Sequence, residues 1–354
     1  MQATKDFKIT RTKNSRLQGL TLKDIPFGKS FTDHMLVADY VNGQWQTPEI
    51  LPYQPLTFEP SLAVFHYGQA IFEGIKAYKA KDGSVQIFRP LDNFQRFNLS
   101  AVRMQMPEVP EDIFMEGLRT LIDIDKDWVP DYENHSLYIR PFMISSDHAI
   151  GVRPSENYKF LIILSPTGPY YAKPMRIYVE EKYVRAVPGG IGFAKAAGNY
   201  GAALYPSMEA HKKGYDQVLW MDAYEHKYVQ ECGTMNAFFI IGDKVITPNL
   251  EEGTILAGVT RDSVITVLKE MGWTVEERPL TIDEICEAYK AGQLKETFGT
   301  GTAATIAYIK ELCYKDLTMH FDTDKWTIAP EVKKRMDAIR YGAVEDKHNW
   351  LWPV

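Results

Sequence analysis

Lys195 is the residue of this sequence best placed to do chemistry. It lies in Gly189-Gly-Ile-Gly-Phe-Ala-Lys-Ala-Ala-Gly-Asn-Tyr-Gly201, a run with too many glycines and apolar side chains for an ordinary solvated helix face. An amine in apolar surroundings loses part of its preference for the charged form, which makes it available as a nucleophile toward aldehydes. Residue type alone favours the alternative of a lysine that packs its stem on the protein and extends its charge into water.

Three downstream segments supply groups that complement a reactive amine. Glu231 adjoins Cys232-Gly-Thr-Met235, a stretch of little polar character, which argues against a solvated carboxylate. Gly258-Val-Thr260 precedes a predicted helix, where backbone amides bind phosphate. Gly299-Thr-Gly-Thr302 adds hydroxyls and amides, although such turns recur in many loops. A pyridoxal phosphate site needs an amine, a phosphate cradle, a donor to the phenolate oxygen and a partner for the ring nitrogen, and this sequence offers a candidate for each.

The elements that must position these residues alternate strands and helices in the first half of the chain. The patterns predict strands over 35–41, 137–144 and 158–164, a hairpin of 77–81 with 85–88, and helices over 93–104 and 111–125. We expect these elements to form a small α+β domain over residues 1–165.

A segment dense in proline and glycine, residues 166–174, predicts an interdomain linker. A larger domain over 175–354 would follow. It would open with a strand at 176–180, place Lys195 in a glycine loop, and continue with helices over 199–213, 261–271, 282–290 and 331–339 and strands over 217–221 and 238–241.

Composition narrows the class of protein. A net charge of −6 and a pI near 5.8 argue against a nucleic-acid partner. No apolar run approaches the roughly 20 residues that cross a bilayer. The three cysteines lack the spacing of a metal site or a redox pair, so we expect no metal and a reducing cytoplasm. The basic stretch Lys5–Lys13 alternates like an opening strand, with a mitochondrial presequence as the alternative.

The sequence resembles the branched-chain amino acid aminotransferases over nearly its whole length, from about Ile25 onward. The similar segments of the second half occur in the family's order and are Gly198-Asn-Tyr-Gly201, Glu231-Cys-Gly-Thr-Met-Asn236, Ala257-Gly-Val-Thr-Arg261 and Phe298-Gly-Thr-Gly-Thr-Ala303. Those of the first half are Phe31-Thr-Asp-His-Met-Leu36, Phe72-Glu-Gly-Ile-Lys-Ala77, Phe88-Arg-Pro90, Asp127-Trp-Val-Pro130 and Leu137-Tyr-Ile-Arg-Pro141.

The resemblance implies a two-domain, fold type IV pyridoxal phosphate enzyme, similar in fold to D-amino acid aminotransferase, with a small α+β domain and a larger α/β domain around a barrel-like sheet. It implies that Lys195 binds the cofactor's aldehyde and that Tyr200 donates to its phenolate oxygen. Glu231 would pair with the ring nitrogen, because a carboxylate there favours the protonated, electron-withdrawing ring. The implied phosphate ligands are Arg96, Val259, Thr260 and Thr302, and Thr234 also lies by the cofactor.

The resemblance also implies a substrate pocket that is apolar or amphipathic, which rewards an aliphatic side chain by about 0.8 kcal/mol per methylene. Its residues would be Phe27, Tyr67, Phe72, Tyr138, Tyr170, Thr234 and Ala303, with Ile150 and Val152 contributed by the partner subunit of a homodimer. Arg140 has two possible roles, as a ligand of glutamate's second carboxylate or as a group that orients Tyr67.

One departure from the family concerns thiols. Animal members carry a Cys-x-x-Cys pair directly after the Gly-Thr-Ala turn, and this sequence has Ala304 and Ala307 there. We therefore expect no redox switch at that place.

We interpret the chain as a homodimeric L-branched-chain amino acid aminotransferase that exchanges amino groups between leucine, isoleucine or valine and 2-oxoglutarate. The alternatives are a D-amino acid aminotransferase or an aminodeoxychorismate lyase of the same fold, and a dimeric binding protein that has lost catalysis. The last is disfavoured by the joint presence of Lys195, Tyr200 and Glu231. A nucleotide-binding module is weaker still, because no Gly-x-Gly-x-x-Gly follows a strand.

Overall fold

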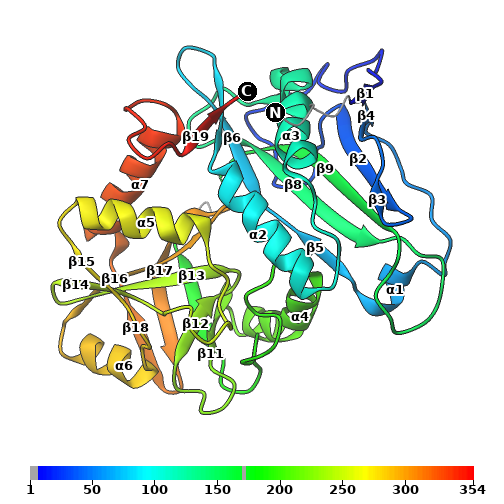
Figure 1. Ribbon diagram of the computed structural model, residues 1–354. Coiled ribbons are helices and arrows are strands. Elements are labelled where there is room, and N and C mark those ends of the chain that lie inside the picture. Colours follow the sequence, from blue (N-terminus) through cyan, green and yellow to red (C-terminus); the bar gives the residue numbers. More distant parts are fainter. Residues whose placement is uncertain (1–6, 170–172) are drawn as a thin grey trace. The chain divides into compact units, whose positions relative to one another are not determined.

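The computed structural model describes residues 7–169 and 173–354. The chain divides into two compact units (Figure 1). Unit 1 comprises Met1–Tyr170, Ala194–Gly198 and Ile339–Val354, and unit 2 comprises Tyr171–Phe193 and Asn199–Ala338. Two short segments of the second half therefore belong with the first, one of them carrying Lys195. The linear division at residues 166–174 that the sequence predicted does not describe these two segments.

Unit 1 is built on a sheet that has ten strands among the described residues. Neighbours along its main path are β1, β4, β2, β9, β8, β6, β7 and β19, while β3 pairs with β2 and β5 with β8. The strands are β1 (Lys8–Ile9), β2 (His34–Val41), β3 (Gln44–Trp45), β4 (Glu49–Pro52), β5 (Ala70–Phe72), β6 (Ile75–Lys79), β7 (Val85–Phe88), β8 (Ser136–Ser145), β9 (Tyr158–Thr167) and β19 (Leu351–Pro353).

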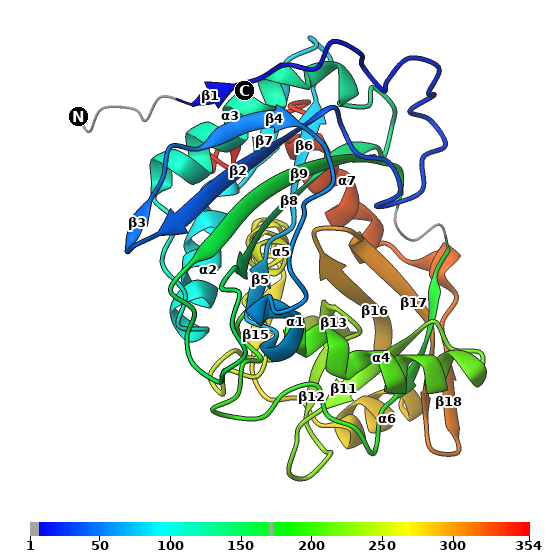
Figure 2. The same ribbon diagram turned by 90° about the vertical axis from the view of Figure 1, so that its right-hand side faces the viewer.

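Helices cover one face of this sheet (Figure 2). They are α2 (Pro90–Arg103) and α3 (Gly117–Ile124), the latter preceded by a π-helical turn at Asp112–Glu116, while the short α1 (Ala63–Tyr67) stands apart. The rings of Phe97 on α2 and Phe114 on the π-helical turn lie 5.4 and 5.6 Å from that of Phe160 on β9. All three are fully buried. Because aromatic rings bury large areas, this cluster fixes α2 firmly against the sheet.

Strand β9 extends two residues into the segment predicted as a linker. Pro166 pairs with Leu137 of β8, although proline has no N–H for a sheet. On its other edge β9 pairs with β2 only as far as Ile163. Pro166 therefore lies where one edge has no neighbouring strand of the sheet, which is where proline is tolerated.

Unit 2 is built on a sheet that closes on itself. Strands β12, β11, β10, β17, β16 and β13 pair in that order, and β13 pairs back to β12. The closed strands are β10 (Met175–Val179), β11 (Gln217–Met221), β12 (Val229–Cys232), β13 (Met235–Ile241), β16 (Leu294–Gly301) and β17 (Thr305–Tyr314). Outside the ring lie β14 (Lys244–Thr247), β15 (Thr274–Glu277) and β18 (Leu317–His320). The barrel-like sheet expected from the resemblance is thus confirmed.

The helices of unit 2 are α4 (Ala197–Lys212), α5 (Val259–Glu270), α6 (Ile282–Lys290) and α7 (Ile328–Arg340). Thr281 caps α6, because its hydroxyl accepts a hydrogen bond from the Glu284 amide. Glu296 performs the same service for α7, as its carboxylate accepts from the amides of residues 327–329. Helix α5 begins at Val259, two residues before the predicted start, so Gly258 is its N-cap.

Candidate active site

The backbone of Lys195 is held by unit 1. Its carbonyl accepts a hydrogen bond from the amide of Phe72 at 3.1 Å, and its amide donates to Ser100 Oγ at 3.0 Å. Ala196 forms an isolated bridge with Ile71 of β5. The Lys195 Nζ lies 5.1 Å from the centre of the Phe72 ring. The glycine-rich run thus places its lysine beside an aromatic face, a setting in which an amine is partly shielded from water.

Arg96 lies on α2 and makes a buried ion pair with Glu73. Its Nε and Nη2 donate to the two carboxylate oxygens of Glu73, each at 2.8 Å. Asn93 Nδ2 and the Gly74 amide also donate to this carboxylate. Burial raises the pKa of Glu73, but Arg96, Lys195 and Asn93 outweigh it and hold that pKa below its ordinary value. The pair fixes the guanidinium of Arg96 in one orientation.

Three predicted pocket residues meet on the same sheet. Arg140 Nη2 donates to the hydroxyl of Tyr138 at 2.9 Å, and its guanidinium lies 4.5 Å from the centre of the Phe72 ring. Phe27 contacts Tyr138 edge-on at 4.8 Å between ring centres. Gly74 is required here, because a Cβ at that position would approach the Tyr138 hydroxyl to 2.4 Å. The hydrogen bond of Arg140 therefore orients Tyr138, whereas the sequence had suggested Tyr67.

The residues predicted to face a partner subunit are exposed. Ile150 and Val152 have 72% and 92% of their surface accessible. Asp147 holds the base of their loop, since its carboxylate accepts from the amides of Glu156 and Asn157. Tyr67, at the end of α1, is also exposed. Tyr170 lies outside the described residues.

Glu231 is buried in unit 2 and faces Arg185. Arg185 Nε lies 2.9 Å from Glu231 Oε2, and the two side chains are 8% and 5% exposed. The Nε–H does not point at the carboxylate, so this contact is an ion pair and not an aligned hydrogen bond. Arg185 Nη2 donates to the carbonyls of Gly192 and Thr254. A single arginine thus connects the glycine-rich run, the carboxylate and the segment before α5.

Glu231 is also tied to the N-terminus of α5. Its Oε1 accepts from the Leu256 amide at 2.9 Å and lies 3.4 Å from Asn236 Nδ2, which also donates to the Leu256 carbonyl. A Cβ at Gly258 would approach Asn236 Oδ1 to 2.0 Å. Only glycine therefore fits at this N-cap, and α5 starts with buried Val259 and Thr260.

The remaining predicted site residues of unit 2 lie on two turns and one helix. Thr234 is exposed in the two-residue turn between β12 and β13, where Gly233 has φ +58°. Thr302 and Ala303 are partly buried in the turn between β16 and β17. Tyr200 lies in the first turns of α4.

Several residues around these groups were not assigned by the sequence. Arg185 follows no motif, and nothing in its neighbourhood signalled a role. Glu73 and Asn236 stand inside the matched segments, so their positions offered a signal that their chemistry alone did not. Ser100 became visible only with the backbone of Lys195 in place.

The comparison with known proteins supplies the family. Residues 70–312 match the model of amino-transferase class IV. A probable branched-chain-amino-acid aminotransferase of Staphylococcus aureus is 48% identical over 342 residues, covering 93% of this chain and 95% of that protein. The chain belongs to the branched-chain-amino-acid aminotransferases of class IV. Membership in this family confirms the resemblance seen in the sequence and makes the chain an aminotransferase.

Solved structures of the same family agree in fold. The branched-chain aminotransferase of Thermoproteus uzoniensis, determined with norvaline, superposes with a TM-score of 0.74 at 25% identity, covering 90% of this chain and 99% of that one. A second branched-chain amino acid aminotransferase, from the organism abbreviated T.th. and determined with N-(5'-phosphopyridoxyl)-L-glutamate, gives a TM-score of 0.71 at 26% identity, covering 89% and 97%. These matches confirm the type IV aminotransferase fold.

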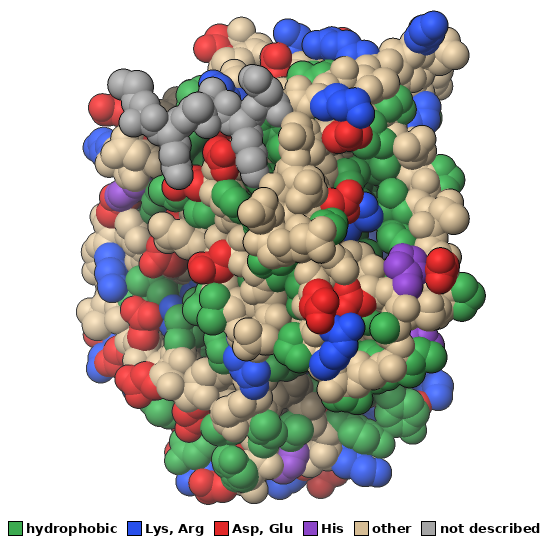
Figure 3. Space-filling view, turned by 45° about the vertical axis from the view of Figure 1, so that its right-hand side comes forward, with side chains coloured by type: hydrophobic (Ala, Val, Ile, Leu, Met, Phe, Trp, Pro, Cys, Tyr) green, Lys and Arg blue, Asp and Glu red, His purple; other side chains and the backbone are tan. Residues whose placement is uncertain are grey.

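The surface of this aminotransferase adds little to the site. Basic side chains are scattered among acidic ones on the face in Figure 3. Within residues 7–169 and 173–354, no group of three metal-ligating side chains is present, and no helix is long and apolar enough to span a bilayer.

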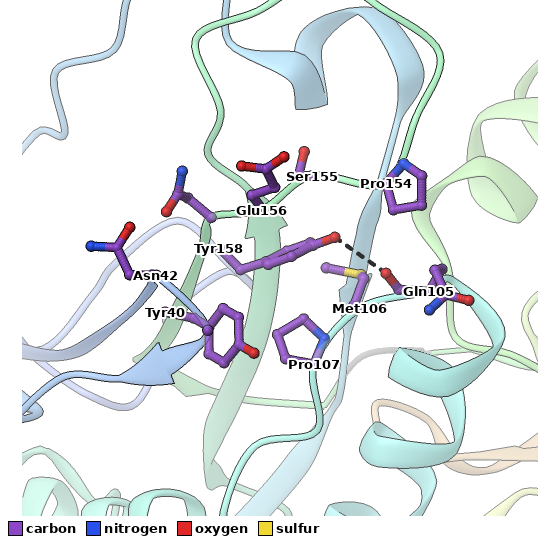
Figure 4. Close-up of a pocket in the computed structure, with 11 residues that line it drawn as sticks. Tyr40, Asn42, Gln105, Met106, Pro107, Pro154, Ser155, Glu156 and Tyr158 are labelled. Carbon is purple, nitrogen blue, oxygen red and sulfur yellow. Dashed lines mark hydrogen bonds between the residues drawn. The ribbon is translucent and has the colours of Figure 1, made fainter.

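A hollow of about 530 Å³ in unit 1 includes none of the predicted site residues (Figure 4). Its central hydroxyl, on Tyr158, donates to the Gln105 carbonyl and accepts from Gln69. Since that group is already paired, the hollow offers no evident polar anchor for a ligand.

Proposed function

We propose that this chain is a homodimeric, pyridoxal phosphate-dependent enzyme that transaminates L-leucine, L-isoleucine and L-valine with 2-oxoglutarate, giving the branched-chain 2-oxo acids and L-glutamate. The observation that carries it is the placement of Lys195 beside Phe72 and near the Arg96–Glu73 pair, in a chain 48% identical to a protein named for this activity. The cytoplasm is the proposed location, because the three cysteines are buried and form no disulfide among the described residues.

The residues present fit pyridoxal phosphate. A phosphate group needs cations and backbone amides, and the chain offers buried Arg96 and the N-terminus of the twelve-residue α5. The pyridine nitrogen needs an acidic partner, which buried Glu231 supplies. Buried carboxylates persist only when paired, and Arg185 meets that requirement. We propose that both groups of residues act on one cofactor.

Each residue would have a distinct task. The cofactor, when bound, accepts the amino group and withdraws electrons from the substrate's α-carbon. Lys195 binds its aldehyde and then carries the proton that leaves the α-carbon. Tyr200 donates to the phenolate oxygen and Glu231 maintains the protonated ring nitrogen. Arg96, Val259, Thr260 and Thr302 hold the phosphate.

The substrate side chain would contact aromatic and small residues. We propose Phe27, Tyr67, Phe72, Tyr138, Tyr170, Thr234 and Ala303 as its lining. Burying the methylenes of leucine or isoleucine there contributes about 0.8 kcal/mol each. For glutamate's second carboxylate we favour Arg140, whose Nε is buried and has no hydrogen-bond partner among the described residues. The phosphopyridoxyl-glutamate bound to the T.th. relative supports glutamate as the second amino acid.

A second subunit would complete the pocket. Ile150, Val152 and Phe65 are 72%, 92% and 63% exposed, and apolar side chains at such exposure mark contact surfaces when they occur together. Subunit pairing would cover them and exclude water from the site. Sedimentation of a dilution series, with activity measured at each concentration, tests this directly. Full activity in a verified monomer contradicts a shared site.

The absorbance spectrum of the purified protein before and after L-leucine tests the whole function. We expect a visible cofactor band that changes on addition of L-leucine, L-isoleucine or L-valine and returns with 2-oxoglutarate. D-leucine is the matched control and leaves the band unchanged. A change with the D-enantiomer alone supports the D-amino acid alternative, and no band at all contradicts the cofactor.

A further inference from the structure

Ser100 lies on α2, four residues after Arg96, and is fully buried. Its hydroxyl accepts a hydrogen bond from the Lys195 amide at 3.0 Å and donates one to the Arg96 carbonyl at 2.9 Å. One hydroxyl group therefore contacts the main chain of both the lysine and the arginine.

These bonds form part of a closed circuit in unit 1. Arg96 grips Glu73 with two hydrogen bonds, and Glu73 follows Phe72 in the chain. The Phe72 amide donates to the Lys195 carbonyl, and the Lys195 amide returns to Ser100. Each link is short, and most lie in the buried interior, where a lost hydrogen bond is costly.

We propose that Ser100 is a positioning residue that fixes the backbone of Lys195 relative to Arg96. This inference rests on the proposed function, in which Lys195 takes the cofactor's aldehyde and Arg96 its phosphate. The distance between those two protein groups must match a rigid ring, and displacements of about 1 Å at a reacting group cost on the order of 100-fold in rate. Ser100 touches neither substrate nor cofactor and acts through the two residues that do.

A helical serine often bonds the carbonyl four residues earlier, and that bond alone would serve only the helix. The bond from Lys195 is different, because it joins segments 95 residues apart. It is also the bond that the test must isolate.

The variant is S100A, and the matched control is S145A. Ser145 belongs to the same unit and is equally buried, but its hydroxyl has no hydrogen-bond partner among the described residues. Hydrogen exchange of the full-length protein is followed in the peptide that contains the Lys195 amide. Affinity for added pyridoxal phosphate, kcat and the KM for L-leucine are measured beside it.

We expect S100A to exchange the Lys195 amide about tenfold faster, to bind the cofactor about 5- to 30-fold more weakly and to lower kcat about tenfold, with KM within about twofold of wild type. S145A matches wild type in all four. S100T, which keeps a hydroxyl, recovers most of kcat. If S100A does not fold, S100C, which keeps the size but accepts hydrogen bonds poorly, takes its place.

Unchanged exchange in S100A overturns the bond itself, and faster exchange with unchanged kcat and affinity overturns the positioning role. Both are distinct from failure of the proposed function, which appears as a wild-type protein that binds no cofactor, and which also removes the role of Ser100.

Discussion

The two units each bury one glutamate against one arginine, and the two pairs differ in construction. In unit 1, both oxygens of Glu73 match two nitrogens of Arg96, with Asn93 and the Gly74 amide adding further donors. In unit 2, Arg185 approaches one oxygen of Glu231 at an angle that makes no hydrogen bond, and Leu256 donates to the other.

The difference shows which carboxylate is a support and which is a reagent. A bidentate pair locks both partners, so Glu73 serves to orient Arg96. A carboxylate held by a cation at one oxygen and an amide at the other remains charged and correctly placed for a third partner. We therefore expect the loss of Glu73 to affect folding most and the loss of Glu231 to affect rate most.

The largest effect should follow E73Q. This change leaves the Arg96 guanidinium buried beside a neutral amide, and breaking a buried pair costs about 3–5 kcal/mol. Denaturant unfolding of the wild type and the variant measures it. E49Q is the control, since Glu49 pairs with Lys8 on the surface, where such pairs contribute about 0–1 kcal/mol. Equal losses in both variants would contradict a structural role for Glu73.

The same pair predicts a dependence on pH. The folded-state pKa of Glu73 lies below its ordinary value of 4.5, so its stabilising contribution is present above that value and is lost as the pH falls through the folded pKa. The stability gap between wild type and E73Q should be full at neutral pH and should narrow in acid. A gap that widens as the pH falls would mean that the pKa is shifted upward.

E231Q comes next and sharpens the contrast. The cofactor should stay bound, while the single-turnover reaction with L-leucine slows about 10²- to 10³-fold, the usual loss for one preorganised electrostatic partner. E180Q provides the control, because Glu180 is also buried in unit 2 but accepts hydrogen bonds from the amides of Lys182 and Tyr183. An unchanged rate in E231Q would show that this carboxylate is not the electronic partner.

R185K should have a smaller effect, about tenfold on the same single-turnover rate. Lysine keeps the charge beside Glu231 but cannot also reach the carbonyls of Gly192 and Thr254, and a charge-assisted hydrogen bond contributes about 1.5–3 kcal/mol. R176K, at an exposed arginine of unit 2, controls for the change of side chain. A rate equal to wild type would reduce Arg185 to a neutralising charge.

The smallest effect concerns the thiols. Burial, helped by the charge of Glu231, raises the pKa of Cys232 to about 12, so almost no reactive thiolate exists near neutral pH. Leucine transamination should therefore be constant across a mild peroxide titration. A loss that a thiol reductant restores, and that C232A abolishes, would place a redox control next to Glu231.

The sequence predicted those parts of the fold that have strong local signals. The hairpin of β6 and β7 and helix α6 match their predicted ranges closely, because turn residues and a helical period mark them. It did not predict β16 and β17, whose pairing closes the barrel, since buried strands interrupted by glycines resemble a loop.

The candidate site divides in the same way. Lys195, Arg96 and Glu231 stand in recognisable segments, so the sequence could name them. Arg185 and Ser100 could not be named, because their significance comes from contacts 46 and 95 residues away in the chain. Such contacts depend on the folded backbone and leave no local pattern.

The most direct test of the central claim is borohydride reduction of the purified protein, followed by peptide mapping. Our account predicts that the cofactor becomes irreversibly attached to a single peptide and that the modified residue is Lys195. Prior addition of L-leucine should prevent the attachment, because the amino group transferred to the cofactor releases the lysine. Attachment to any other lysine, or none in a protein that carries the cofactor, would contradict the account.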